Sequence, residues 1–257
     1  MKLQVRDLQI SFGDRRVVEL ARLDLDGGEI VGIVGESGSG KSMTSLAILG
    51  LAQTLGAEVG GSILFEEREL VGAPEATLRA IRGSRIAMIF QHPVSAFNPV
   101  FRVGDVFVRA LRVHGASKSE ARARAHAALH EVLLSPDLLE RYPHQLSGGQ
   151  AQRVAVALAV ALRAELLIAD EATSALDVTV QAEIVELLKR LRAEEGMGIL
   201  FISHDLAVVG QLCDRVAVMR GGQLVEDGAT ADVLHAPKEQ YTRELIAAVP
   251  RIARGRT

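Results

Sequence analysis

The sequence GESGSGKS, residues 35–42, decides the fold of this chain. It directly follows the apolar run IVGIV at residues 30–34, and a helical pattern continues from about Gly40 to Leu51. Glycine loses the most backbone freedom on folding, so a cluster of glycines indicates that the backbone approaches another group closely. The order of strand, loop and helix matches G-x-x-x-x-G-K-[ST], which predicts a loop whose N–H groups surround a phosphate.

This loop carries the groups that phosphate recognition requires. Lys41 supplies a positive charge for the β- and γ-phosphates, and the Ser42 hydroxyl is a candidate Mg²⁺ ligand. The N-terminus of the following helix adds a favourable partial charge. The chain has no N-K-x-D sequence for guanine, which disfavours a GTPase. The predicted nucleotide-binding residues of the loop are Gly35, Glu36, Ser37, Gly38, Ser39, Gly40, Lys41, Ser42 and Met43.

A second segment, LLIADEATSALD at residues 166–177, is an apolar run that ends in two carboxylates. Asp170 is placed to hold Mg²⁺, directly or through water, and Glu171 to polarise the attacking water as a general base. The alternative is a strand that merely ends at a charged turn, and the phosphate loop upstream disfavours it. A nucleoside triphosphate and Mg²⁺ are therefore the predicted ligands.

A third segment, LSGGQ at residues 146–150, places a serine and two glycines at the start of a helical pattern over residues 149–163. Such a helix N-terminus can bind an anion. The chain therefore has two candidate phosphate sites. Either it binds two anions, or each site completes the nucleotide pocket of another subunit.

Composition and charge exclude several classes of protein. A net charge of -3 provides no global basic field, so we expect no nucleic-acid partner. The one cysteine, Cys213, excludes an internal disulfide and a multi-cysteine metal site, and we expect it to be buried. No apolar run approaches the ~18 residues that span a bilayer, and the N-terminus has no export signal. We expect a cytoplasmic protein that reaches a membrane only through a partner.

The hydrophobic pattern predicts an α/β fold. Residues 3–10 and 17–25 alternate apolar and polar side chains, which predicts two antiparallel strands with a turn near Gly13 and Asp14. Later apolar runs, typical of strands buried on both faces, alternate with helical patterns, which predicts a largely parallel sheet with helices on both faces. A helical block near residues 92–160 interrupts this order, and we interpret it as an inserted subdomain. The predicted later strands are residues 62–65, 86–90, 166–170, 198–203, 215–219 and 223–227.

In order and spacing, GESGSGKS, Gln91, LSGGQ, LLIADE, SALD and His204 resemble the motifs of ABC-type ATPase domains, over nearly the whole chain. LSGGQ between the other two motifs is highly specific to that family. The resemblance implies a P-loop NTPase fold with an antiparallel β subdomain and an inserted α-helical subdomain. It places a RecA-like ATP-binding core with the β subdomain at residues 1–90 and 161–230, the helical signature subdomain at 91–160, and a short helical tail at 231–257.

The resemblance also implies a head-to-tail dimer, in which ATP lies between the phosphate loop of one domain and LSGGQ of the other. This arrangement would explain the two phosphate sites. Gln91 would contact Mg²⁺ and the attacking water, and His204 would contact the γ-phosphate, so both join Glu171 as predicted catalytic residues. Asp177 would cross the dimer interface. The residues predicted to contact the partner's ATP are Ser147, Gly148, Gly149 and Gln150.

Three positions are less regular than the motifs. Phe12 is a candidate to stack on adenine, although packing within the β subdomain is an alternative role for it. Ala172 follows Glu171 where the family usually has proline, and Met43 stands where a hydroxyl residue is common. The Met43 side chain cannot bond the α-phosphate, but its backbone N–H can. We expect activity to survive both departures.

Two further segments resemble importers of dipeptides, oligopeptides and nickel. They are FQHPVSAFNPVFRVGDV at residues 90–106, which in those importers receives the membrane subunit, and HAPKEQYTRELIAAVP at residues 235–250. SAFNP and the short tail are most similar to the nickel branch. The resemblance implies an ATPase at the cytoplasmic face of the inner membrane that drives uptake of peptides, nickel or metal–metallophore complexes.

The partners implied are two membrane-spanning permease subunits, a second identical or related ATPase, and indirectly an extracytoplasmic substrate-binding protein. The alternative is a soluble ABC ATPase of repair or translation. It is disfavoured because Lys41 and Ser147 are too close in the sequence for a long coiled coil to lie between them, and because the chain has one set of motifs.

His126 and His130 share a helix face, but two ligands rarely hold a metal, so we interpret them as solvated.

Overall fold

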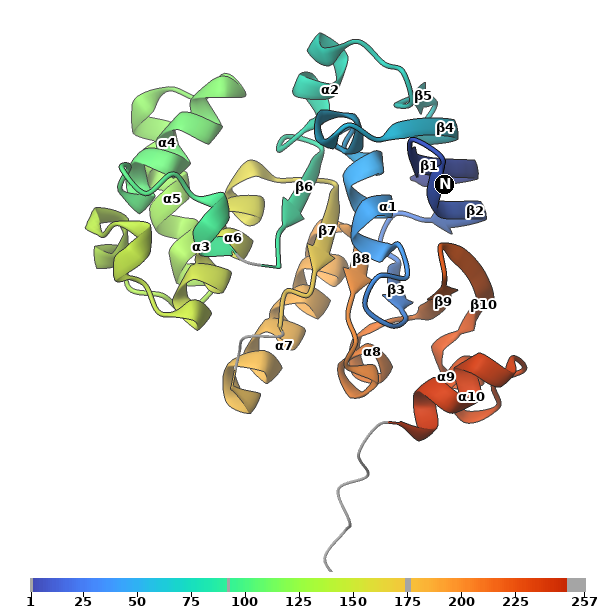
Figure 1. Ribbon diagram of the computed structural model, residues 1–257. Coiled ribbons are helices and arrows are strands. Elements are labelled where there is room, and N and C mark those ends of the chain that lie inside the picture. Colours follow the sequence, from blue (N-terminus) through green and yellow to red (C-terminus); the bar gives the residue numbers. More distant parts are fainter. Residues whose placement is uncertain (1, 92, 174–176, 249–257) are drawn as a thin grey trace, which may run out of the picture.

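The computed structural model describes residues 2–91, 93–173 and 177–248 (Figure 1). The strands of its central sheet are β3 (Ile30–Val34), β6 (Ile86–Ile89), β7 (Leu166–Asp170), β8 (Gly198–Ile202), β9 (Arg215–Arg220) and β10 (Gln223–Ala229). Their spatial order is β10-β9-β3-β8-β7-β6, and all neighbours are parallel except β10 and β9. Every residue of β3, β7 and β8 is buried, as the continuous apolar runs predicted. The predicted α/β fold is confirmed.

A second sheet is antiparallel. Its strands are β1 (Leu3–Phe12), β2 (Arg15–Leu25), β4 (Glu58–Phe65) and β5 (Arg68–Glu69), in the order β2-β1-β4-β5. The predicted hairpin of β1 and β2 is present, with Phe12 paired to Arg15 across the turn. On the inner face, Val5 lies between Leu23 and Ile63, so the alternation in the sequence becomes one apolar face.

Each face of the central sheet has its own apolar core. One face packs against α6 (Gly148–Leu162), α7 (Val178–Glu195) and α8 (Leu206–Leu212). The other face packs against the antiparallel sheet, α1 (Lys41–Ile48) and α2 (Glu75–Ile81), near the short 3₁₀-helix η1 (Ala52–Leu55). The prediction of helices on both faces therefore holds only in part. The antiparallel sheet takes part of the second face because its own apolar inner face must be buried, and here it packs against the central sheet.

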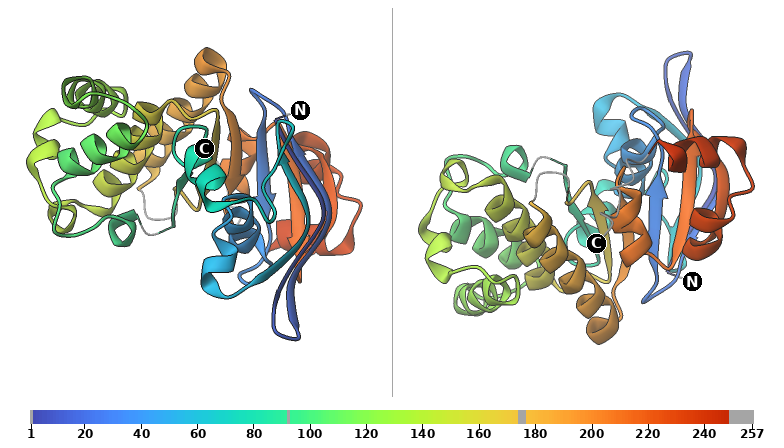
Figure 2. Two further views of the ribbon diagram at one scale, coloured as in Figure 1. Left: turned by 90° about the horizontal axis from the view of Figure 1, so that it is seen from above. Right: turned by 90° about the horizontal axis from the view of Figure 1, so that it is seen from below.

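The chain between β6 and β7 forms a helical block beside the sheets (Figure 2). Its elements are α3 (Pro93–Ala96), α4 (Val103–Val113), α5 (Lys118–Glu131), η2 (Pro136–Glu140), η3 (Pro143–Gln145) and α6. Small buried residues of α5, such as Ala121 and Ala125, pack in one core with Phe107 of α4. Because β6 and β7 are adjacent in the sheet, the block leaves and rejoins the core at neighbouring points.

The last described elements are α9 (Thr230–His235) and α10 (Gln240–Ala247), which follow β10 (Figure 1). Cys213 is 7% exposed, and burial raises the pKa of its thiol, so the expectation of a buried cysteine is confirmed. Within the described ranges, none of the helices combines the length and the apolar character that crossing a bilayer requires.

Candidate nucleotide-binding site

The phosphate loop leaves β3 in a conformation that requires glycine. Gly35 has φ +152°, and a Cβ there would lie 2.1 Å from the Met219 carbonyl oxygen, so a side chain cannot fit. Gly40 has φ +100° at the start of α1, where a Cβ would meet Val18 at 2.9 Å. The glycines thus let the loop turn closely against β9 and β2 and direct its N–H groups into the space at the N-terminus of α1.

Lys41 is enclosed by this loop. Its ammonium donates hydrogen bonds to the Gly35 and Glu36 carbonyl oxygens, both at 2.8 Å, and to Ser39 Oγ at 3.2 Å. Burial lowers the pKa of Lys41, and the carboxylates of Glu171 and Asp170 act in the opposite direction. A buried cation held by loop carbonyls places positive charge where phosphate recognition needs it.

A cavity of about 420 Å³ opens over the loop. Phe12, which is 36% exposed, lies on its wall with Arg15 and Val17 of the β1–β2 hairpin. The structure therefore places the predicted adenine-stacking residue at the same cavity as the loop. The remaining lining residues are Ser37, Gly38, Ser39, Gly40, Lys41, Ser42, Met43, Gln91 and Glu171.

Asp170 is the last residue of β7 and directly precedes Glu171 of the cavity wall. Its side chain is buried, and no described residue gives its Oδ1 a hydrogen bond. Burial raises the pKa of Asp170, while a hydrogen bond with the Ser42 hydroxyl acts to lower it. A buried carboxylate oxygen without a partner, beside a hydroxyl, is the kind of oxygen donor set that Mg²⁺ takes, so the residues present fit this ion.

Glu171 lies at the centre of a small hydrogen-bond network. Its backbone has φ +49° and is held from both sides: its N–H donates to Ile202 at 2.9 Å, and its carbonyl accepts from Gln152 at 3.3 Å. Its side-chain oxygens contact Gln91 Nε2 at 2.5 Å and His204 Nδ1 at 3.4 Å. The structure therefore brings together the three residues predicted to be catalytic.

The LSGGQ residues do not line this cavity. Ser147 and Gly148 are exposed at the start of α6, while Gly149 and Gln150 are half-buried. Ser147 caps the helix: its Oγ accepts from the Gln150 N–H at 3.2 Å, and its own N–H donates to Gln150 Oε1 at 3.0 Å. The N-terminus of α6 is thus exposed to solvent and does not contribute to the cavity over the phosphate loop of the same chain.

Asp177 is an exposed cap as well. Its Oδ1 accepts from the N–H groups of Thr179 at 3.1 Å and Val180 at 3.0 Å at the start of α7. The residues before it in SALD, Ser174 to Leu176, lie outside the described residues. Asp177 therefore stays a predicted interface residue.

The two departures from the family pattern fit the fold. Ala172 is completely buried after Glu171. Met43 is half-buried, packs against the core between the sheets, and contributes to the cavity wall.

In the described ranges, no three His, Cys, Asp or Glu side chains are placed to hold a metal, and His126 and His130 are both exposed.

Four of the described residues at the site were not predicted: Arg15 and Val17 on the cavity wall, Gln152 behind Glu171, and Tyr241, whose hydroxyl accepts from the Glu36 N–H at 3.1 Å. Arg15 lies three residues after Phe12, and that proximity was an available signal. Gln152 lies 19 residues from Glu171, and Tyr241 lies 205 residues from Glu36, so no local sequence pattern predicts these contacts.

Residues 18–174 match the model of the ABC transporter family. This chain belongs to the ABC transporter family. The family match confirms the family that the motifs predicted. The Glutathione import ATP-binding protein GsiA of Salmonella typhimurium (strain LT2) is 47% identical over 97% of this chain. The Dipeptide transport ATP-binding protein DppD of Escherichia coli (strain K12) is 45% identical over 98% of it. This ABC-family chain spans 42% of the GsiA protein and 79% of DppD.

Solved ABC structures agree with this fold. The dimeric structure of MJ0796, a bacterial ABC transporter cassette, superposes with a TM-score of 0.79 at 27% identity, covering 89% of this chain and 98% of that one. A dimeric post-hydrolysis state of the same cassette bound to ADP and Pi gives 0.78 at 28% identity, with the same two coverages. The P-loop fold of an ABC ATPase, with its antiparallel and helical additions, is therefore confirmed.

Proposed function

We propose that this chain hydrolyses ATP to drive the import of small peptides through partner membrane subunits. The observation that supports this most is that Gln91 and Glu171 line the cavity over the phosphate loop and contact each other, while His204 contacts Glu171. A carboxylate held by an amide and an imidazole, next to a phosphate site, is a general base in position to act on water.

In this proposal the loop residues bind the phosphates of ATP. N–H groups from Gly38 to Met43 face the phosphates, Lys41 adds its charge, and Phe12 stacks on adenine from the hairpin. Asp170, Ser42 and Gln91 would hold Mg²⁺, which supplies charge neutralisation for the β- and γ-phosphates.

Hydrolysis then needs an oriented water. Glu171 accepts a proton from that water, Gln91 fixes the carboxylate in place, and His204 contacts the γ-phosphate. The positive φ of Glu171 aims its side chain at the cavity, and the hydrogen bonds from Gln152 and to Ile202 maintain this backbone.

The position of LSGGQ supports a two-chain site. Ser147 and Gly148 are exposed and separate from the cavity of their own chain, so the anion they suit belongs to a second ATPase. Asp177 would contribute to that interface. The solved relative MJ0796 is dimeric, which supports an arrangement of this kind.

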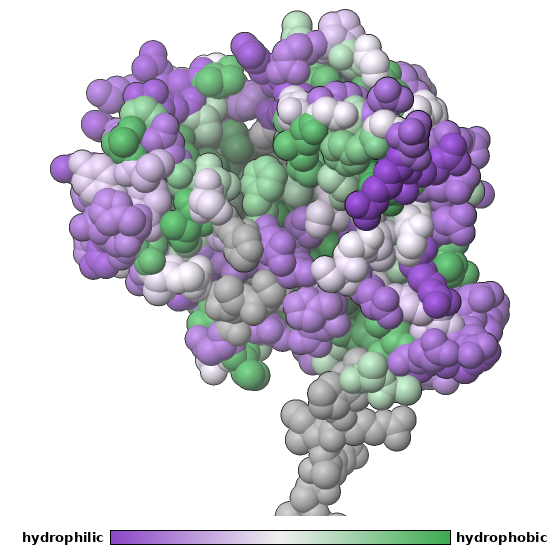
Figure 3. Space-filling model, viewed as in Figure 1, coloured by the Kyte–Doolittle hydropathy of each residue, from purple (hydrophilic) through white to green (hydrophobic). Residues whose placement is uncertain are grey.

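The region around Gln91 supports a membrane partner. Phe90, Val94 and Val100 are apolar and 38%, 39% and 70% exposed, in the segment that resembles the docking region of importers. Hydrophobic residues also show at the surface between the helical block and the core (Figure 3). Exposed apolar residues concentrated in one segment are typical of an interaction site. We propose that two permease subunits dock there, which holds the chain at the cytoplasmic face of the membrane.

The relatives guide the proposed cargo. GsiA is a glutathione import protein and DppD a dipeptide transport protein, which favours peptides over the nickel or metallophore complexes that SAFNP suggested. A substrate-binding protein outside the membrane would deliver the peptide. In this proposal residues 1–90 and 161–230 form the ATP-binding core, residues 91–160 the signature subdomain, and the segment from residue 231 a short tail.

The test is an affinity capture from detergent-solubilised membranes with the Glu171→Gln variant and ATP. We expect two multi-span proteins and an ATPase to be recovered, and less of them with ADP and the wild-type chain. Recovery of soluble partners alone would remove the import proposal and favour the soluble alternative. The captured binding protein is then screened with dipeptides, glutathione and Ni²⁺.

A further inference from the structure

The C-terminal helix α10 contacts the phosphate loop directly. The hydroxyl of Tyr241 accepts a hydrogen bond from the backbone N–H of Glu36, the second residue of the loop, at 3.1 Å. Tyr241 is 5% exposed, so its ring is part of the apolar core on the helical side of the central sheet. This hydrogen bond is partly shielded from water, and it joins two residues that are 205 positions apart in the chain.

The outer side of the loop is supported by neighbouring backbone as well. Arg220, at the end of β9, places its guanidinium 4.7 Å from the centre of the Tyr241 ring. The carbonyl of Met219 lies against Gly35, and the N–H of Gly222 donates to the Ser39 carbonyl at 3.0 Å. The β9–β10 turn and Tyr241 therefore hold the loop from outside, while Lys41 fills it from inside.

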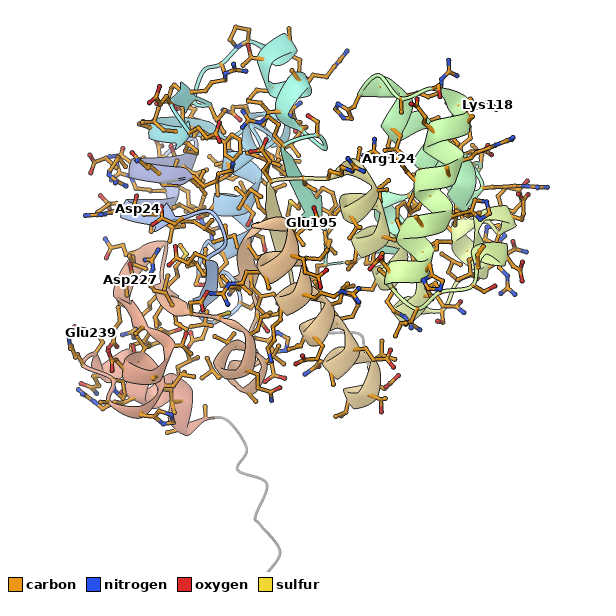
Figure 4. The ribbon with its side chains drawn as sticks, turned by 180° about the vertical axis from the view of Figure 1, so that it is seen from behind. Asp24, Lys118, Arg124, Glu195, Asp227 and Glu239 are labelled. Atoms are coloured by element: carbon orange, nitrogen blue, oxygen red, sulfur yellow. The ribbon has the colours of Figure 1, made fainter. Side chains whose placement is uncertain are left out.

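The position of Tyr241 is itself fixed. Glu226 of β10, which is nearly buried, accepts from the N–H groups of Lys238 at 2.8 Å and Glu239 at 3.2 Å, just before α10 begins. Thr242, next to Tyr241, is 1% exposed. Figure 4 shows Glu239 on the same edge of the molecule as Asp24 and Asp227, on the opposite side from Lys118 and Arg124 of the helical block. The segment that carries α9 and α10, as far as residue 248, is thus docked on the core beside the loop.

We propose that Tyr241 is a positioning residue for the phosphate loop, and that docking of α10 raises the affinity of the loop for the phosphates of ATP. A loop already held in its binding shape loses less conformational freedom when the nucleotide binds. By linkage, ATP must stabilise the docked helix by the same factor by which docking favours ATP. The inference rests on the loop binding ATP.

The first experiment compares Tyr241→Phe with Tyr142→Phe. Tyr241→Phe keeps the ring against Arg220 and removes only the hydroxyl, so it should fold. Losing one neutral hydrogen bond should weaken ATP binding by about 2- to 10-fold. The KM for ATP should rise by this factor while kcat at saturating ATP stays within about twofold. Tyr142 is the other tyrosine of the chain, and its substitution should leave ATP affinity unchanged.

Hydrogen exchange gives a readout that does not depend on nucleotide. In the nucleotide-free chain, amide exchange of residues 35–41 should be faster in Tyr241→Phe than in the wild type, because Glu36 loses its acceptor. Adding ATP to the wild type should slow exchange in residues 240–247. Unchanged ATP affinity together with unchanged exchange of the loop in Tyr241→Phe would overturn the inference.

Fluorescence adds a local probe, because the chain has two tyrosines and no tryptophan. In the Tyr142→Phe chain, all tyrosine emission comes from Tyr241, and ATP should change its intensity. An emission that ATP leaves unaltered would contradict coupling between loop and helix. If the wild-type chain itself fails to bind ATP, the proposed role of the loop is wrong, whereas the exchange of Glu36 still reports whether Tyr241 holds it.

Discussion

The Gln91 side-chain amide donates to Glu171 Oε2 over 2.5 Å, although 80 residues separate the two in the chain. They meet because Gln91 follows β6 and Glu171 follows β7, which are adjacent parallel strands with Ile89 paired to Ala169. The helical block begins directly after Gln91. A movement of that block relative to the core would therefore move Gln91 relative to Glu171, which couples the block to the proposed general base.

Replacing Glu171 by Gln should stop hydrolysis and preserve ATP binding. A glutamine keeps the size of the side chain but cannot accept a proton, so turnover should fall about 100- to 10,000-fold. Phosphate release and ATP affinity are measured on the same preparation. Glu195→Gln is the matched control, because Glu195 is exposed at the end of α7 (Figure 4) and does not line the cavity. Rapid turnover by Glu171→Gln would assign the base elsewhere.

Replacing Asp170 by Asn should separate stability from activity. Burial raises the pKa of Asp170, so its charged form is disfavoured in the folded chain, and stability without nucleotide falls as pH rises through that pKa. The neutral variant should therefore resist urea at pH 7 at least as well as the wild type. Mg²⁺-dependent hydrolysis should fall by about 100-fold or more, because the carboxylate proposed to hold the ion is lost. A variant that keeps full Mg²⁺-dependent turnover would contradict the assignment.

The Ser147 hydroxyl has two proposed tasks, capping α6 and contacting the ATP of a partner. Ser147→Ala should cost about 1 kcal/mol of stability as a lost cap, and should also abolish ATP-dependent dimerisation. Ser117→Ala is the matched control, because Ser117 caps α5 through the same reciprocal pair of hydrogen bonds with Glu120. Sedimentation velocity with ATP, in the Glu171→Gln background, should show dimers for Ser117→Ala and monomers for Ser147→Ala. Equal dimerisation of the two variants would restrict Ser147 to its structural task.

Glu165 should make stability depend on acid pH. Hydrogen bonds from Arg85, with a smaller contribution from Lys2, lower its pKa from 4.5 to about 2 against the opposing effect of burial. A lowered carboxyl pKa stabilises the fold above pH 4.5, and this stabilisation is lost as pH falls toward about 2.

The measurement is urea unfolding of Glu165→Gln and wild type over this range. Glu165 is more than one third exposed, so solvent screening limits the expected difference at pH 7 to about 1 kcal/mol. The difference should disappear near pH 2, and a difference that grows as pH falls would contradict the assigned direction.

Much of the fold followed from local patterns. The IVGIV run, the glycines and Lys41 fix strand, loop and helix because their spacing is itself the structure of the motif. The pairing of β1 with β2 followed from alternation and a short turn. The packing of the antiparallel sheet against one face of the central sheet was less predictable. A periodic pattern shows that a strand has an apolar face, but it does not show which element packs against that face.

The sequence by itself determined the family, the phosphate loop and the identity of the candidate catalytic residues, since each rests on residues close together in the chain or on short motifs in a fixed order. Only the tertiary structure decided that Gln152 supports Glu171 and that Tyr241 supports Glu36. These contacts depend on the strand order of the central sheet and on where α6 and α10 pack, and both are set by burial across the whole domain rather than by local spacing.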